Sequence, residues 1–324
     1  MRTLLIHADG KLPNLALMRL SAHLKECGRD IELTHSIAPM LAGEYEQVYC
    51  SVIFQKTWPK VEALLTHCPT AIVGGTGSGS WRTLEDMGMA GEAVDYSPYP
   101  DFPHSIGFSQ RGCRLTCKFC VVPQKEGRPK NPMAIRKLWR GEPWPKEIIL
   151  LDNDFFGEPS WRERAQEIID GQYKVSICQG INVRNLTDEQ ADYLSRMGTY
   201  SLNFKRRCVY TAWDNPADAD RVVAGLRRII EKGLRPANIM VYMLIGYWPG
   251  ETDKDWEYRR SILRGLGVTP YPMPFSRNQI TIGYQRWVVG AYDKQIPWSE
   301  WIAAGYYPTG LTRRLAQAVL PLEG

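Results

Sequence analysis

Short apolar segments alternate with helix-like patterns along most of this sequence, and no other feature restricts the fold as strongly. A strand, a helix and a second strand in succession are typical of a parallel sheet, so the alternation predicts an α/β fold. Before residue 98, helices are expected from Asn14, as N-cap, to Gly28 and over 61–67. Strands are expected over 3–7, 31–34, 47–54 and 70–73. This region is therefore expected to form an open, Rossmann-like sheet.

Three prolines, Pro98, Pro100 and Pro103, mark the best candidate for a domain boundary. A second alternating series follows, with strands expected over 105–109, 147–151, 173–177, 209–212, 238–245 and 269–275. Six strand–helix units in about 170 residues predict a partial (β/α)6 barrel, since a complete eight-stranded barrel usually needs about 250 residues. From residue 277 onward the pattern has no clean period. The expected domains are 1–98, 99–276 and a C-terminal extension, 277–324.

Two helices of the second series carry clear starting signals. Thr187 and Gln190 are spaced as a capping box, so a helix is expected to begin between them. Asn215 followed by Pro216 predicts the start of another helix, whose apolar residues form one stripe before Gly233.

The composition argues against a membrane or secreted protein. No apolar run approaches the roughly 18–20 residues that span a bilayer, and the N-terminal apolar stretch is too short for a signal peptide. Eight cysteines in 324 residues are too sparse for a disulfide scaffold. We therefore expect a cytoplasmic protein with no membrane partner. The net charge of +5 permits a phosphate-rich partner without requiring one.

Three of the cysteines lie close together, as Cys113, Cys117 and Cys120, in a C-x3-C-x2-C pattern directly after an expected strand. Three thiolates on a short loop can ligate three irons of a [4Fe–4S] cluster and leave the fourth iron open. An open iron suits a chelating molecule, here S-adenosylmethionine through its amino and carboxylate groups. A structural zinc site is the alternative, but it normally needs a fourth ligand, and His104 on the preceding strand would be an unusual one. Basic side chains expected to offset the charge of a cluster are Arg111, Arg114 and Lys118.

With Gly112 before the first cysteine and Phe119 before the third, this loop resembles the signature of the radical SAM superfamily. Two further segments are similar to motifs of cobalamin-type radical SAM proteins: 151–156 (LDNDFF) and 244–252 (LIGYWPGET), the second with one extra residue. Residues 14–22 resemble the start of an uncharacterised subgroup of phage and bacterial radical SAM proteins. The resemblance covers nearly the whole chain, but only the barrel carries specific motifs.

The resemblance implies roles for residues around the loop. The three cysteines ligate the cluster, and the backbone of Phe119 lies beside the adenine of S-adenosylmethionine. Ile245 and Gly246 line the same adenine, where glycine allows a close backbone approach. Asn153 and Asp154 meet the methionine amino group or the ribose. The full set of cofactor-binding candidates is Phe119, Asn153, Asp154, Gln179, Asn182, Arg184, Ile245 and Gly246.

Each of the other candidate residues could have either a chemical role or a purely structural one. Arg184 would bind the methionine carboxylate. The alternative is that its segment is a polar loop without a binding role. Tyr210 and Asp214 bracket the end of the fourth barrel strand as candidate catalytic residues, with a turn or cap role open for Asp214. Cys178 is a candidate radical relay, as is Cys208, although such residues more often pack.

The N-terminal region is patterned like a cobalamin-binding domain. The loop after its third strand, 54–59, lacks the Asp-x-His-x-x-Gly motif that ligates cobalamin. Only the segment 74–79 has the small residues that would let a large ring or a phosphate tail approach the backbone. Cobalamin stays open as a cofactor, but we expect it to be absent. The cysteines of this region, Cys27, Cys50 and Cys68, are expected to be buried free thiols.

The expected function is that of a radical SAM enzyme, which reductively cleaves S-adenosylmethionine at a [4Fe–4S] cluster to a 5′-deoxyadenosyl radical and abstracts hydrogen from a substrate. An external electron donor of the flavodoxin or ferredoxin type is implied. The positive net charge, the aromatic content and the resemblance to phage proteins favour a nucleobase or nucleotide substrate. One enzyme of this kind would be an isomerase that acts in the hypermodification of phage DNA. A cobalamin-dependent methyltransferase, a small-molecule biosynthetic enzyme and a non-catalytic, metal-stabilised binding protein stay open.

Overall fold

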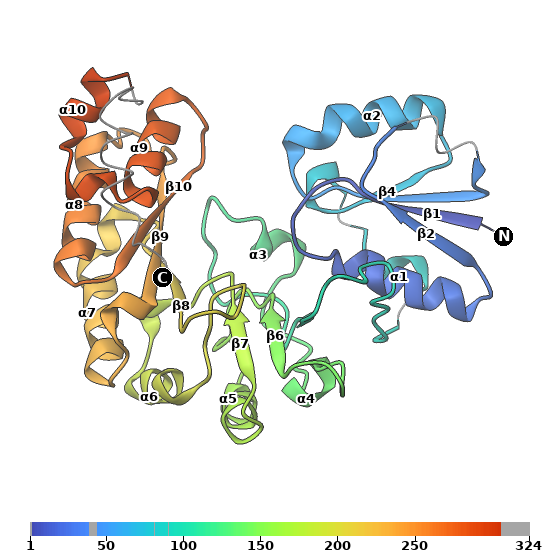
Figure 1. The fold of residues 1–324 in the computed structure, drawn as a ribbon, viewed down its shortest axis with the longest axis horizontal. Coiled ribbons are helices and arrows are strands. Elements are labelled where there is room, and N and C mark those ends of the chain that lie inside the picture. Colours follow the sequence, from blue (N-terminus) through green and yellow to red (C-terminus); the bar gives the residue numbers. More distant parts are fainter. Residues whose placement is uncertain (1, 39–43, 81, 90, 306–324) are drawn as a thin grey trace, which may run out of the picture. The chain divides into compact units, whose positions relative to one another are not determined.

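The computed structural model describes residues 2–38, 44–80, 82–89 and 91–305. It is a mixed α/β structure built on parallel sheets, which confirms the expected fold class (Figure 1). The chain divides into two compact units, one of Met1–Ile106 with Glu142–Pro145 and one of Gly107–Gly141 with Lys146–Gly324. Among the described residues, no helix is both long and apolar enough to traverse a bilayer.

The N-terminal unit contains a four-stranded parallel sheet of order β2-β1-β3-β4. Its strands are β1 (Arg2–His7), β2 (Asp30–Thr34), β3 (Gln47–Ser51) and β4 (Ile72–Gly74). The helices α1 (Leu15–Glu26) and α2 (Trp58–His67) cover opposite faces of this sheet (Figure 1). Leu17 of α1 packs in one core cluster with Leu5, whereas Val61 of α2 packs in the other with Leu4. Short 3-10 turns are η2 (Gln55–Thr57), η3 (Thr76–Ser78) and η4 (Glu85–Met87).

Local interactions set the ends of these elements. The side chain of Asn14 accepts a backbone N–H of the first turn of α1 at 3.2 Å, and Gly28 follows the helix at φ +75°, as expected. The strand expected to reach Phe54 ends at Ser51 instead. The carboxylate of Asp9 accepts the N–H groups of the two residues before η2 at 2.8 and 3.0 Å, which draws that backbone out of the sheet.

The expectation of three buried thiols in this unit is wrong for two of them. Cys50 is buried on β3, but Cys68 is only half-buried and Cys27 is exposed. Both lie at the C-caps of helices, where the chain turns away from the core.

The later parallel strands form two three-stranded sheets, of order β5-β6-β7 and β10-β9-β8, and all of them except the first two residues of β5 belong to the C-terminal unit. Their bounds are β5 (Ser105–Gly107), β6 (Glu147–Leu150), β7 (Lys174–Ile177), β8 (Val209–Ala212), β9 (Ile239–Ile245) and β10 (Thr269–Pro274). Every one falls within an expected strand. Between β7 and β8, single parallel bridges join Val175 to Thr199 and Ile181 to Thr211. The strands from β5 to β10 are therefore spatial neighbours in the order in which they occur along the chain.

Helices cover one face of β8, β9 and β10 (Figure 1). Val241 and Ile245 of β9 point into a core that also contains Leu226 of α7 and Leu263 of α8. Because successive strand residues alternate between faces, Tyr242 points to the other side. The helices of this unit are α3 (Val122–Lys125), α4 (Ile135–Leu138), α5 (Trp161–Asp170), α6 (Asp188–Arg196), α7 (Ala219–Glu231), α8 (Asp253–Gly265), α9 (Gln279–Val289) and α10 (Trp298–Ala303). The 3-10 turns are η5 (Val183–Asn185), η6 (Pro216–Asp218), η7 (Pro236–Asn238) and η8 (Tyr292–Lys294).

The two expected helix starts have different outcomes. Thr187 and Gln190 form the expected capping box at the start of α6. Asn215 and Pro216 instead open the 3-10 turn η6, and α7 begins directly after it.

The segment after residue 277 has no clean apolar period, yet its described part forms α9 and α10. The period is hidden because the buried face of α9 includes Thr281 and Gly283 beside Tyr284 and Trp287. Those two aromatic residues and Trp301 of α10 lie in the same core as the strands. Residues 277–305 therefore share a core and a compact unit with the second strand series.

Candidate functional site

The cysteine loop follows β5 and folds on itself. Its cysteines, Cys113, Cys117 and Cys120, are half-exposed free thiols. Gly112, at φ +83°, lies where a Cβ would be 2.3 Å from the carbonyl oxygen of Arg128, so only glycine fits. The N–H of Cys120 donates to the carbonyl of Cys117 at 3.0 Å, which keeps the last two cysteines in one turn. The loop thus presents three thiols from a conformation that its own backbone stabilises.

The end of β6 holds this loop in place through two carboxylates. Asp152 is fully buried and accepts the N–H of Ser109 at 2.7 Å as well as its hydroxyl. Burial raises the pKa of Asp152 to about 6, and the hydrogen bonds from Ser109 oppose that rise. Asp154 accepts from Arg114 three times: from the backbone N–H at 3.1 Å, from Nε at 2.8 Å and from Nη2 at 3.0 Å. Asn153, between the two carboxylates, is half-buried.

The three basic residues of the loop differ in their surroundings, and one of them, Arg114, interacts electrostatically with Cys113. The ion pair with Asp154 already balances the charge of Arg114. The Nη1 atom of Arg111 lies 3.9 Å from Oε1 of Glu126. The third basic residue, Lys118, is exposed. Arg184 is a further cation that interacts electrostatically with a cysteine of the loop, Cys117.

The segment after β7 brings Arg184 to the cysteine loop. Its Nη1 donates to Asp218 at 2.6 Å and its Nε donates to the side-chain oxygen of Asn182 at 3.2 Å. Arg184 also interacts electrostatically with the Cys117 side chain, which helps to raise the pKa of Arg184. The amide nitrogen of Asn182 is buried without a hydrogen-bond partner among the described residues, which leaves an unused donor beside the loop. Gln179, in contrast, is exposed.

Asp214 lies just beyond the end of β8, in the same region. Burial raises its pKa to about 6, while the N–H of Leu244 and the charges of Arg184 and Arg259 oppose that rise. The charge of Asp214 in turn acts on Cys120. A carboxyl group with this pKa changes protonation near neutral pH, as acid–base chemistry requires.

The end of β9 is anchored by an ion pair that the sequence analysis missed. Glu251 and Arg259 are paired with side chains that are 1% and 0% exposed. Glu251 accepts the N–H of Gly246 at 2.8 Å, and Arg259 donates to the carbonyls of Trp213 at 3.0 Å and Leu244 at 2.9 Å. The pair therefore joins the ends of β8 and β9. Its sequence signal was the carboxylate of the LIGYWPGET motif followed by a basic residue on the next helix.

Aromatic rings connect the cysteine loop to β9 and β10. Tyr247 contacts Phe119 of the loop, with ring centroids 5.6 Å apart, and Phe275 at 4.7 Å. Trp248, the next residue, contacts Tyr247 at 5.1 Å. Tyr247 of the longer motif thus packs against the loop, and Trp248 packs against Tyr247. Ile245, in contrast, has a fully buried side chain in the helix-covered core, so its side chain does not face the loop.

The remaining candidates lie on the strand face opposite the helices. Tyr210 and Tyr242 stack with ring centroids 5.6 Å apart and planes at 11°. The hydroxyl of Tyr242 donates to the carbonyl of Cys178 at 3.2 Å, and the hydroxyl of Tyr210 accepts the N–H of Leu202 at 3.3 Å. Burial raises the pKa of Tyr210 to about 12 and that of Cys178 to about 11, so both are protonated at neutral pH.

Whether the cysteine loop fits a metal depends on the kind of site. Among the residues that the structure describes, no three His, Cys, Asp or Glu side chains are placed to hold a single ion. A [4Fe–4S] cluster bonds each cysteine to a different iron, so its ligands stand further apart than those of one zinc ion. Three free thiols on one short loop are the donor set that such a cluster needs. Burial raises the pKa of Cys113 to about 11, so this thiol is neutral near pH 7 when no metal is bound.

The glycine-rich segment at the carboxyl edge of the N-terminal sheet packs closely against the neighbouring backbone. A Cβ on Gly75 would lie 2.2 Å from the carbonyl oxygen of Val52, and one on Gly77 would lie 2.7 Å from the carbonyl carbon of Phe54. These two glycines are therefore needed for contact with the neighbouring loop of the chain.

The contacts above bring together the cysteine loop and the carboxyl ends of β6, β7, β8 and β9. No protein-family model, curated protein or solved structure matches this chain. Function is accordingly inferred from the arrangement of these residues.

Proposed function

We propose that this chain is a radical SAM enzyme in which Cys113, Cys117 and Cys120 hold a [4Fe–4S] cluster. The observation that carries the proposal is the position of three free thiols on one loop, held by residues that follow successive parallel strands. Enzymes with parallel α/β sheets build their sites at this edge. The chain order of the six strands supports a partial (β/α)6 barrel, with a Rossmann-like N-terminal unit beside it in the sequence.

When bound, the cluster supplies the electron that cleaves S-adenosylmethionine, which yields the 5′-deoxyadenosyl radical that abstracts hydrogen from the substrate. Phe119 and Tyr247 provide an apolar wall that excludes water at the loop. The unused amide donor of Asn182 and the carboxyl group of Asp214 provide polar contacts for the amino-acid part of S-adenosylmethionine or for the substrate. Asp154 acts on the site by positioning the loop, since Arg114 occupies its carboxylate.

The proposed substrate is a nucleobase or nucleotide. The partly exposed ring of Tyr242, stacked on Tyr210, supports a planar substrate, because aromatic rings stack on any base. The carbonyl of Cys178 accepts the hydroxyl of Tyr242, so Cys178 lies next to this pair. This position supports Cys178 as a candidate radical relay. A flavodoxin or ferredoxin is the proposed external electron donor.

Anaerobic reconstitution of the full chain tests this function. We expect about four iron and four sulfide per chain, since each ligating cysteine accounts for one of the cluster's irons and the fourth iron stays open. Reduction with dithionite in the presence of S-adenosylmethionine should then yield 5′-deoxyadenosine, measured by liquid chromatography. One tightly bound zinc per chain without cleavage would contradict the proposal and favour a metal-stabilised binding protein.

The purified chain is expected to contain no cobalamin. The contacts of Gly75 and Gly77 with the adjacent loop explain the glycine-rich segment without a corrin ring. Added hydroxocobalamin should therefore not remain bound after gel filtration, as followed by its visible absorption, and should not change turnover. Copurification of one corrinoid per chain would show this expectation to be wrong and would move the proposed function toward methyl transfer.

A further inference from the structure

The positive charge of the chain is concentrated around the cysteine loop. Residues 111–130 contain six Lys and Arg side chains and a single acidic one, Glu126. Their net charge of +5 equals that of the whole chain, so the remaining residues carry no net charge. Lys and Arg clustered in one place are the electrostatic signature of a surface that binds nucleic acid.

Three of these cations face water without a counter-charge. Lys118, Arg128 and Lys130 are exposed, and no carboxylate pairs with them among the described residues. Arg111 and Arg114, in contrast, each lie against a carboxylate, so their charge is already offset. The three exposed cations are therefore available to an anionic partner.

The backbone places these cations beside the cysteines. Lys130 and Arg111 form an antiparallel bridge, in which each N–H donates to the carbonyl of the other residue at 2.9 and 3.0 Å. The Nη1 atom of Arg128 donates to the carbonyl of Arg114 at 2.9 Å. Lys118 lies within the cysteine loop itself. The exposed cations thus flank the loop on both strands of its base and at its turn.

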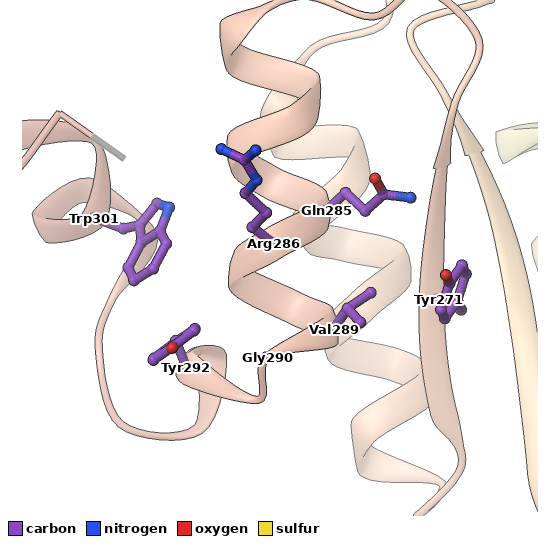
Figure 2. Close-up of a pocket in the computed structure, with 7 residues that line it drawn as sticks. All are labelled: Tyr271, Gln285, Arg286, Val289, Gly290, Tyr292 and Trp301. Atoms are coloured by element: carbon purple, nitrogen blue, oxygen red, sulfur yellow. The ribbon is translucent and has the colours of Figure 1, made fainter. Parts of the chain in front are cut away.

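Partly exposed aromatic rings lie near the same loop. Phe275 is 52% exposed and contacts Tyr247, which in turn contacts the loop. Tyr271, drawn on β10 in Figure 2, contacts Tyr242 with ring centroids 5.8 Å apart. The N–H of Phe275 donates to the carbonyl of Ile245, so the strand geometry continues to this residue and puts Phe275 on the same side as Tyr271. Several such rings suit a run of bases better than a single base.

We propose that this surface binds a single-stranded nucleic acid, so that the substrate base belongs to a strand and is not a free nucleotide. The phosphates bind Lys118, Arg128 and Lys130. Bases that neighbour the substrate base stack on Phe275 and Tyr271. Exposed cations beside aromatic rings are the combination that single-strand-binding proteins use, whereas an acidic protein partner would need only the charge. The inference rests on the proposed function, because it concerns how the substrate reaches the cysteine site.

Fluorescence anisotropy of a labelled oligothymidylate of about 12 residues, titrated with the reconstituted full chain, tests the proposal. Three phosphate contacts predict a slope of about −2 for the logarithm of the association constant against that of the salt concentration, since each contact to a single strand contributes about −0.7. Binding should therefore weaken about 20-fold between about 50 and about 200 mM NaCl. An abasic strand of the same length should bind at least about fivefold more weakly, because it cannot stack.

Substitutions assign the binding to this surface. Arg128→Gln combined with Lys130→Gln should weaken strand binding at least about tenfold at low salt and reduce the slope to about −0.7. Phe275→Ala should weaken the intact strand at least about fivefold and leave the abasic strand unchanged. Arg227→Gln combined with Lys232→Gln, exposed on α7 and at its C-cap, is the matched control and should leave strand binding unchanged.

Should Arg128→Gln disturb the loop through its lost bond to Arg114, Lys118→Gln combined with Lys130→Gln gives the same test. Strand binding that is independent of salt, or unchanged in both double variants, would overturn the proposal. So would binding of an acidic flavodoxin, lost in the double variants, without binding of the strand, which would assign the surface to the electron donor. A chain that cleaves S-adenosylmethionine but does not bind the strand contradicts this inference alone, whereas bound zinc without cleavage contradicts the proposed function.

Discussion

Replacement of any one of Cys113, Cys117 or Cys120 with Ala is expected to abolish cluster binding and 5′-deoxyadenosine formation. Each substitution removes a soft thiolate ligand that neither water nor a serine hydroxyl replaces. The reconstituted variants should lack the brown visible absorption of the cluster, measured against reconstituted wild-type protein. Cleavage of S-adenosylmethionine should fall below detection in the same samples.

The folded structure should survive these substitutions, which separates loss of a ligand from loss of the fold. The three side chains are half-exposed and lie outside the core clusters, so each should change the free energy of unfolding by less than about 1 kcal/mol. Cys27→Ala, at an exposed cysteine of the N-terminal unit, is the matched control and should keep full cluster content. A loop variant that retains full cleavage activity would overturn the ligand assignment.

Arg259→Met is expected to destabilise the C-terminal unit by about 3–5 kcal/mol, the usual cost of leaving one partner of a buried ion pair without its counter-charge. The substitution also removes the donors to the carbonyls of Trp213 and Leu244. Urea denaturation followed by tryptophan fluorescence measures the change. Because Glu251 then loses the charge that holds it at Gly246, S-adenosylmethionine cleavage should also fall in the variant that remains folded.

A double variant and a variant of an exposed ion pair test whether burial of the charges causes the destabilisation by Arg259→Met. Glu251→Gln combined with Arg259→Met removes both charges, so it should cost less than Arg259→Met alone. Arg162→Met breaks the exposed pair with Glu189 and should cost less than about 1 kcal/mol. If Arg259→Met costs no more than Arg162→Met, the buried pair does not stabilise the end of β9.

The placement of strands in the second series could be predicted closely because it depends on short segments. Each strand from β5 to β10 lies within its expected range, and the Thr187–Gln190 capping box is where the spacing predicts it. In these cases, residues within about four positions of one another make the decisive contacts. The same reasoning fails for α9, where Thr281 and Gly283 occupy the buried face and weaken the periodic signal.

The partners of the site residues were not predictable from the same patterns. Asp154 appears in the sequence as a polar residue after a strand, but it binds Arg114, 40 positions earlier. Ile245 appears beside Gly246 in one motif, yet alternation along β9 turns its side chain into the core. Arg184 binds Asp218, 34 positions later, and interacts electrostatically with the Cys117 side chain.

The amino-acid sequence by itself determined the α/β class, the positions of the strands and the spacing of three cysteines on one loop, because neighbouring residues decide each of these. Only the tertiary structure decided which side chains surround that loop and that Glu251 and Arg259 are buried together. Such contacts join residues from different elements, and their free energy depends on burial and on hydrogen-bond partners that appear only when the elements pack.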